Sequence, residues 1–142
     1  MAALELGRRR RLSEAEQRAV VSSSKDVYHL MKPLLEDLEL EQFWVLYLNN
    51  ANKVLAKLNL SKGGITATLV DVRLLLKRAS ALNSTGLILC HNHPCGTLRA
   101  TDADCKLTEK VKVFAKLMDI QLLDHIIVTD QSYFSFADTG RI

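Results

Sequence analysis

Two stretches of the chain carry apolar side chains at every position instead of at alternate positions, and they restrict the fold more than any other feature. Residues 43–50 (FWVLYLNN) open with six such side chains, and residues 87–90 (LILC) contain no polar one. Neighbouring side chains of a strand point to opposite faces of a sheet, so a strand of this kind must be covered on both faces. The pattern predicts an α/β fold, a mixed β-sheet with flanking helices, in which residues 87–90 form a central strand.

The helices are predicted from amphipathic segments of the sequence. Ser23 can cap a helix with Asp26 three residues on, and Pro33 predicts a kink or an early end of that helix. Two further helices are predicted over residues 72–82 and 101–118. The side chains predicted to face the core are Val27, Leu30, Met31, Leu34 and Leu35 in the first helix, and Leu107, Val111, Phe114, Ala115 and Met118 in the last.

The length of 142 residues predicts one domain, residues 1–142, in which residues 1–22 form an N-terminal helical extension rich in helix formers. The remaining strands are predicted over residues 53–60 and 65–70, and as a closing pair over residues 120–130 and 132–138.

Composition indicates the compartment and limits the classes of partner. No apolar run approaches the roughly 20 residues of a membrane helix, and the first residues lack the apolar core of a signal peptide. Three cysteines, an odd number, do not suggest a disulfide framework, so a reducing cytoplasm is expected. The net charge of +3 is too small to indicate nucleic acid, although four arginines stand at residues 8–11. They are interpreted as a solvated helix face or a mobile arm, with a phosphate-binding patch as the alternative.

His91 and His93 follow the predicted central strand and are two residues apart. In extended backbone such side chains point to the same side, where two imidazoles can bind one divalent metal. Asp104 is the predicted third ligand, because the turn residues Pro94 and Gly96 allow the next helix to fold back. Alternatively, Asp104 only caps that helix, since Thr101 stands three residues before it.

A hydrolytic metal site also needs a base, and three acidic residues precede the strand at residues 43–50. They are Asp37, Glu39 and Glu41. Glu41 shares strand parity with Phe43, but spacing alone does not separate it from Glu39. Each of these acids, taken singly, is also compatible with a solvated loop carboxylate.

Taken together, these motifs resemble those of the RadC-like proteins of the JAMM (JAB/MPN) zinc metalloprotease superfamily, over the chain from about residue 24 to its end. This resemblance implies a JAB/MPN layered domain of the broader cytidine-deaminase-like fold. It also implies a Zn²⁺ ion held by His91, His93 and Asp104, and a water activated by Glu41. The segments that carry it are EQF at 41–43, HNHPCG at 91–96, TDAD at 101–104, LDH at 123–125 and YFSF at 133–136.

The chain departs from the family pattern at two serines and in length. Cys95 replaces one serine and is interpreted as a simple substitute for it, with a fourth metal ligand or an inhibitory thiolate as the alternative. Thr101 replaces a serine that stabilises the oxyanion in JAMM peptidases, and its hydroxyl can serve the same role. Full-length RadC proteins also carry a helix-hairpin-helix region, for which 142 residues are too few.

Other motifs and single residues in the sequence indicate a function less clearly. The letters HNH at 91–93 do not indicate an HNH nuclease, whose motif residues are dispersed over a hairpin and a helix. A zinc deaminase would need Glu at the position of His93 and Cys at that of Leu98. Asp124 and His125 are interpreted either as orienting a zinc ligand or as making a structural hydrogen bond at a strand. Cys90 is expected to be an inert core thiol, and His29 a surface or structural residue.

The sequence therefore predicts a zinc-dependent metallopeptidase-type hydrolase that cleaves peptide or isopeptide bonds of a protein or peptide substrate. In this interpretation a zinc-bound water, activated by Glu41, attacks a carbonyl, and Thr101 shares the oxyanion charge. The alternative is a non-catalytic metal-binding interaction module associated with DNA repair or mobile-element functions. Direct DNA binding or cleavage through residues 8–11 is a third, weaker hypothesis.

Overall fold

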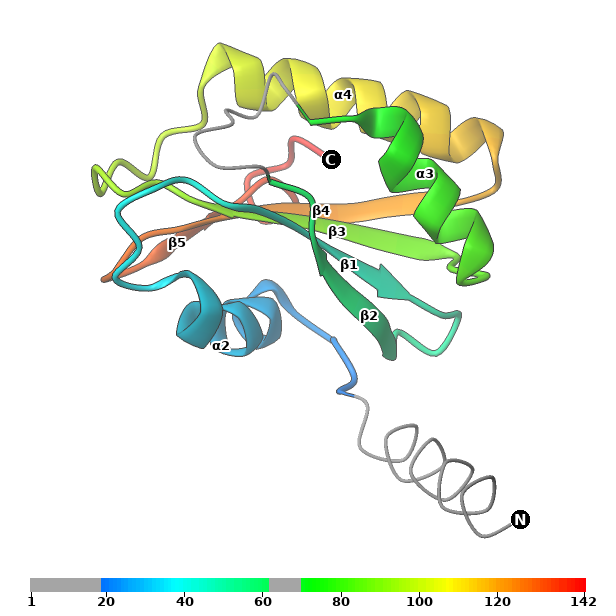
Figure 1. The fold of residues 1–142 in the computed structure, drawn as a ribbon, viewed down its shortest axis with the longest axis horizontal. Helices are drawn as coiled ribbons and strands as arrows, with labels where there is room; N and C mark the ends of the chain where they lie inside the picture. The colour runs from blue at the N-terminus through cyan, green and yellow to red at the C-terminus, as the bar shows by residue number, and fades with distance from the viewer. Residues whose placement is uncertain (1–18, 62–69) are drawn as a thin grey trace, which may run out of the picture.

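The computed structural model describes residues 19–61 and 70–142, which form a five-stranded mixed sheet with helices on both faces (Figure 1). The strand order is β2-β1-β3-β4-β5. The helices are α2 (Ser24–Leu35), α3 (Val72–Ala81) and α4 (Asp102–Leu117). The strands are β1 (Phe43–Leu48), β2 (Val54–Asn59), β3 (Gly86–Asn92), β4 (Gln121–Val128) and β5 (Tyr133–Ser135).

The predicted central strand is confirmed. β3 is buried at every position and lies between β1, to which it is antiparallel, and β4, to which it is parallel. A parallel pair needs a long connection, which α4 provides between β3 and β4. β3 also extends two residues further than predicted, so His91 lies within the strand.

Two apolar cores lie on the two faces of the sheet, because α3 and α4 cover one face and α2 covers the other (Figure 1). Leu87 and Leu89 of β3 pack toward α3 and α4, whereas Ile88 and Cys90 pack toward α2. This alternation places the side chain of His91 on the face of α4. The α/β class predicted from the doubly apolar strands is therefore confirmed.

The boundaries of several elements differ from the prediction. Residues 1–18 of the helical extension and residues 65–69 of one predicted strand lie outside the described residues. Val20 pairs with Lys53 in an isolated antiparallel bridge, so the predicted helix does not include this part of the extension. The last predicted strand is shorter than expected, because only Tyr133–Ser135 pairs with β4. α2 ends two residues after Pro33, as an early end predicts.

The predicted inner faces of the helices are partly wrong. On α4, Phe114 is 46% exposed and Met118 43% exposed, while Leu107, Val111 and Ala115 are buried. The buried stripe of α4 instead continues at its N-terminal end through two polar residues, which therefore face the sheet: Asp104 and Thr108. On α2, Leu34 is exposed and Leu30 only partly buried, and Tyr28 is buried in their place.

Candidate metal centre

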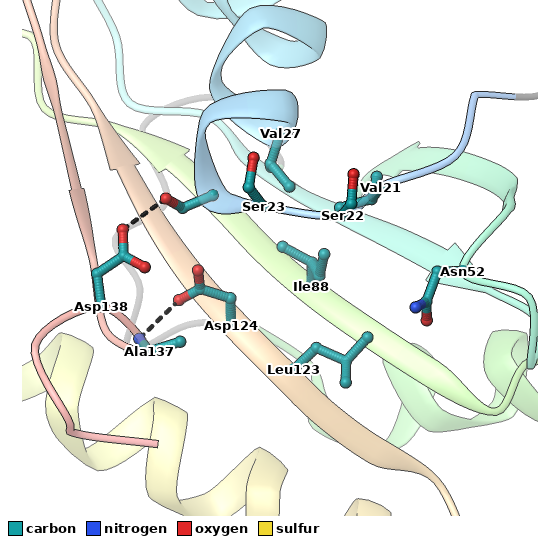
Figure 2. Close-up of a pocket in the computed structure, with 11 residues that line it drawn as sticks. Val21, Ser22, Ser23, Val27, Asn52, Ile88, Leu123, Asp124, Ala137 and Asp138 are labelled. Carbon is teal, nitrogen blue, oxygen red and sulfur yellow. Dashed lines mark hydrogen bonds between the residues drawn. The ribbon is translucent and has the colours of Figure 1, made fainter.

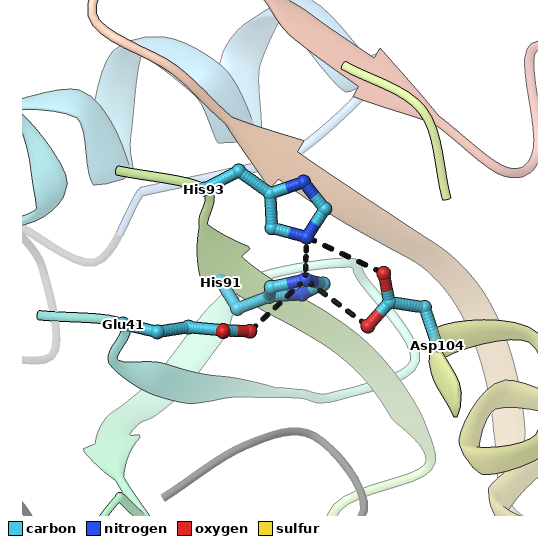
Figure 3. A group of neighbouring side chains, drawn as sticks. All are labelled: Glu41, His91, His93 and Asp104. Carbon is cyan, nitrogen blue, oxygen red and sulfur yellow. Dashed lines mark hydrogen bonds and ion pairs between the residues drawn. The ribbon is translucent and has the colours of Figure 1, made fainter. Parts of the chain in front are cut away.

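Four side chains from three regions of the fold meet at the end of β3 (Figure 3). Glu41 comes from the loop between α2 and β1, His91 and His93 from the end of β3 and the residue beyond it, and Asp104 from the first turn of α4. One ligand atom from each of the four residues lies within 4.8 Å of the others. The two histidines and Asp104 are buried, whereas the side chain of Glu41 is 28% exposed.

Local structure explains why Asp104 points at the histidines. Thr101 caps α4 by accepting a hydrogen bond from the Asp104 N–H at 3.1 Å, and the Asp104 carboxylate accepts one from the Thr101 N–H at 3.0 Å. This capping box anchors the carboxylate, which also faces both imidazoles. Asp104 therefore caps α4, and it also belongs to the group of four side chains that could hold a metal ion, which we call the metal cluster.

The distances among these atoms are close to those around a tetrahedral zinc ion, although the two nitrogens lie closer together than in such a site. The Nε2 atoms of His91 and His93 are 2.9 Å apart; His91 Nε2 lies 3.3 Å from Oδ1 of Asp104, and His93 Nε2 lies 3.3 Å from its Oδ2. Zinc bonds of about 2.0–2.1 Å set neighbouring tetrahedral ligand atoms about 3.3–3.4 Å apart. Two imidazoles and a carboxylate are also a donor set that zinc accepts, and three protein ligands leave one position for water. Glu41 Oε1, 3.5 Å from His91 Nε2, borders this group.

Charge favours cation binding at the same point. Burial of Asp104 opposes ionisation, but hydrogen bonds from His91 and His93 outweigh it and hold the pKa of this carboxyl well below its usual range. The hydrogen bond to Asp104 raises the pKa of His93 above its ordinary value. Asp104 is thus an anion that faces both imidazoles, an arrangement to which a divalent cation can bind.

A chain of hydrogen bonds behind His91 sets its orientation. His91 Nδ1 lies 2.8 Å from His125 Nε2, His125 Nδ1 lies 2.6 Å from Thr108 Oγ1, and Thr108 Oγ1 donates to the Asp104 carbonyl at 2.6 Å. If His91 offers Nε2 to a metal, its Nδ1 carries the proton and donates to His125, which in turn donates to Thr108. Burial lowers the pKa of His125 well below its ordinary value, which keeps this ring neutral, as the chain requires.

Comparison with known proteins agrees with this geometry. A profile described as a RadC-like JAB domain matches residues 21–141. The chain belongs to the RadC-like JAB domain family. It is 49% identical over 140 residues to a protein of Flavobacterium johnsoniae named UPF0758, covering 99% of this chain and 61% of the relative. UPF0758 proteins of Porphyromonas gingivalis and Leptothrix cholodnii are 43% and 41% identical, with 100% and 99% of this chain and 63% and 64% of those relatives covered.

This RadC-like JAB chain therefore spans less than two thirds of the length of these relatives. Their shared name states no activity.

Across residues 19–61 and 70–142, no helix is both long enough and apolar enough to cross a bilayer.

The structure brings together some, but not all, of the residues singled out in the sequence. Among the acids before β1, Glu41 joins the cluster, whereas Glu39 is exposed and the Asp37 backbone binds Asp130. Thr101 is exposed, and its oxygen accepts the Asp104 N–H. Cys95 is exposed, and its Sγ lies 3.4 Å from Thr97 Oγ1.

Two more residues singled out in the sequence lie in the described part of the chain, Cys90 and His29. Cys90 is fully buried, and burial raises the pKa of its thiol, which agrees with an inert core residue. His29 lies on the exposed side of α2. The arginines at 8–11 lie outside the described residues.

In this RadC-like JAB domain the Asp124 carboxylate accepts the His125 N–H, but the side chains of the two residues lie on opposite faces of the sheet. His125 faces the metal cluster, but Asp124 lies on the opposite face of the sheet, beside a pocket of about 290 Å³ under α2 (Figure 2). Its carboxylate accepts hydrogen bonds from Ser135 Oγ and from the N–H groups of Ala137 and His125. Asp124 therefore holds the β4–β5 corner, whereas His125 supports a candidate ligand.

The sequence did not identify the residues that bind the far sides of the imidazole rings, away from the metal cluster. Thr108 binds His125, and the Thr97 carbonyl lies 2.7 Å from His93 Nδ1. The spacing of Thr108 four residues after Asp104 puts both side chains on one helix face, which is a signal that could have identified it. The contact of Thr97 depends on the shape of the loop after β3, which local pattern does not encode.

Replacing Thr108 by valine tests the hydrogen-bond chain. Valine keeps the shape of the side chain but removes the acceptor of the His125 N–H, so zinc affinity is expected to fall by about 10–100-fold. Isothermal titration with Zn²⁺ measures this, and Ser84→Ala is the matched control. Ser84 is also a buried hydroxyl donor, but it precedes β3 at the end opposite to the histidines. An equal fall in both variants would contradict a role of Thr108 in metal binding.

Replacing Asp124 by alanine is expected to cost about 2–4 kcal/mol of unfolding free energy, because two buried donors and one partly buried donor lose their acceptor. Asp124→Asn keeps an accepting oxygen and is expected to cost less than half as much. Burial raises the pKa of Asp124, so removing its charge also relieves a desolvation cost. Urea denaturation measures both values, and a similar loss in the two variants would show that the hydrogen bonds are not the cause.

Proposed function

We propose that this RadC-like JAB chain is a zinc-dependent hydrolase of peptide or isopeptide bonds. The observation that carries the proposal is the convergence of His91, His93 and Asp104, with Glu41 beside them, so that their ligand atoms lie within 4.8 Å of one another. This arrangement supports a catalytic site more than a closed structural one, because three ligands leave a position free and a partly exposed carboxylate borders it.

In this proposal His91, His93 and Asp104 would hold the ion. When bound, zinc supplies Lewis acidity, which makes water more nucleophilic and polarises a carbonyl. His125 and Thr108 keep the His91 ring in the tautomer that presents Nε2. The Thr97 carbonyl does the same for His93 by accepting from Nδ1.

Glu41 handles the proton. It accepts one proton from the attacking water while the water oxygen forms a bond to the carbonyl carbon. When the bond between that carbon and the nitrogen breaks, Glu41 returns the proton to the leaving amine. Water is consumed, and a carboxylic acid and an amine are released.

Thr101 is proposed to donate a hydrogen bond near this site. Its oxygen accepts the Asp104 N–H, the residue is exposed, and its hydroxyl makes no hydrogen bond as donor to any of the described residues. A substrate carbonyl in front of Asp104 would lie beside this donor. Thr101 is therefore proposed to stabilise developing negative charge.

The test combines metal analysis with a cleavage screen. Purified protein is expected to hold about one zinc per chain, and to cleave members of a peptide and isopeptide library. Cleavage should stop with a chelator and return when Zn²⁺ is added back. Absence of stoichiometric zinc, together with no effect of His91→Ala, would refute the proposal. Stoichiometric zinc without cleavage that depends on Glu41 would favour the alternative, a metal-binding interaction module.

A further inference from the structure

Asn92 lies between the two histidines but its side chain contacts a different part of the molecule. It is 3% exposed, and in a strand its position directs it to the face opposite His91. Its Oδ1 accepts a hydrogen bond from the Gln42 N–H at 2.6 Å, and its Nδ2 donates to the Leu40 carbonyl at 3.1 Å. Asn92 thus binds the backbone on both sides of Glu41.

The segment that carries Glu41 is held at Leu38, which packs against the core under α2, but its backbone next to Glu41 has no regular hydrogen-bonded structure. It joins α2 to β1 outside both elements, and Leu40 within it is 61% exposed. The Asp37 N–H donates to Asp130 at the start of the segment. At its end, the Gln42 side chain accepts from Trp44 Nε1 and Asn59 Nδ2, but these contacts do not involve the backbone next to Glu41. The peptide groups of Leu40 and Gln42, on the two sides of Glu41, are instead bound by Asn92.

The chemistry of an amide side chain suits this task. Holding a carbonyl on one side and an N–H on the other requires one donor and one acceptor at the end of a short side chain. A carboxylate would repel the Leu40 carbonyl, and a hydroxyl is too short to reach two peptide groups. Asparagine also adds no charge beside the histidines.

We infer that Asn92 is a positioning residue: it holds Glu41 at the rim of the metal cluster. The inference rests on the role given to Glu41 in the proposed function. It assigns all three residues of the HNH segment separate tasks, since His91 and His93 face the metal cluster while Asn92 ties the loop of the base to the same strand. β3 and the residue that follows it therefore carry the two candidate ligands and also set the distance from them to the base.

The experiment uses Asn92→Ala in the full chain, with Asn59→Ala as the matched control. Asn59 is also an amide that binds Gln42, but through the side chain of Gln42. The first readout is hydrogen exchange of the Gln42 amide by NMR. Exchange is expected to rise by about tenfold in Asn92→Ala, the factor that loss of one hydrogen bond carries, and to stay unchanged in Asn59→Ala. Amides of β1, such as that of Val45, should keep their protection.

The second readout is the visible spectrum of the Co²⁺-loaded protein over a range of pH. Asn92→Ala is expected to leave Co²⁺ affinity unchanged but to move the midpoint of the spectral pH profile toward that of Glu41→Gln. The double variant, Asn92→Ala with Glu41→Gln, is expected to have the same midpoint as Glu41→Gln alone, because Asn92 acts through Glu41. A merely structural role would not produce this non-additivity. Asn92→Asp, which keeps only the acceptor, should lie between wild type and Asn92→Ala in Gln42 exchange.

The outcomes separate the inference from the function on which it rests. Unchanged Gln42 exchange in Asn92→Ala would overturn the inference. So would an additive double variant, or a wild-type pH profile in Asn92→Ala while Glu41→Gln shifts it. If Glu41→Gln leaves the profile unchanged while Gln42 exchange still rises, the role of Glu41 in the proposed function fails, and with it the positioning role of Asn92.

Discussion

Replacing Asp104 by asparagine is expected to lower zinc affinity by more than about 100-fold, since even substitutions behind the ligands cost about 10–100-fold. The asparagine side chain would keep the size of the original and an oxygen that can accept the Thr101 N–H, so α4 should still be capped. It would lack the negative charge that faces both imidazoles at 3.3 Å. The loss should therefore appear in metal binding and not in the fold.

Zinc titration monitored by calorimetry, with circular dichroism of the metal-free protein, measures the two effects separately. Asp102→Asn is the matched control, because Asp102 is also an acid in the first turn of α4 but lies outside the cluster. Its zinc affinity is expected to equal that of the wild type. An Asp104→Asn variant that binds zinc as tightly as the control would show that this carboxylate is not a ligand.

Replacing Glu41 by glutamine is expected to reduce the rate of substrate cleavage by about 10²–10⁴-fold, the range for loss of a general base. The glutamine amide retains the shape of the side chain but cannot accept a proton from water. Zinc content should stay at the wild-type value, because His91, His93 and Asp104 are unchanged. The measurement is the turnover rate on a substrate that the wild-type zinc protein cleaves in the library screen.

Glu39→Gln provides the comparison for this prediction. Glu39 lies two residues earlier in the same loop, is exposed, and is not part of the cluster. Its replacement is expected to change the rate by less than about twofold. Equal rates in the two variants would remove Glu41 from the proposed mechanism, whatever the metal content.

Much of the fold follows from local pattern. The doubly apolar residues 87–90 predicted a central covered strand because side chains alternate between the faces of a sheet, and β3 is that strand. The same alternation predicted that His91 and His93 point the same way. On α4, Phe114 and Met118 were predicted to be buried because they are apolar. They are exposed, because the face of α4 that contacts the sheet runs through Asp104 and Thr108 instead.

The selection of Glu41 over Glu39 required more than spacing. Both acids precede β1 by a few residues, and the preference for Glu41 came from the resemblance to the RadC-like family. In the structure the backbone on each side of Glu41 binds Asn92, which is 50 residues from Gln42 in the sequence. A contact of that range arises only when β1 and β3 pair, and no local pattern specifies it.

By itself, the sequence determined the central strand, the common direction of the two histidines and the cap that orients Asp104, because each depends on residues within about one turn or a few strand positions of one another. Only the tertiary structure decided which acid borders the cluster, and that His125, 34 residues from His91, supports it while Asp124 does not. The physical reason is strand order. β3 lies between β1 and β4, so these three strands bring the loop of Glu41, the two histidines and His125 together from distant parts of the chain.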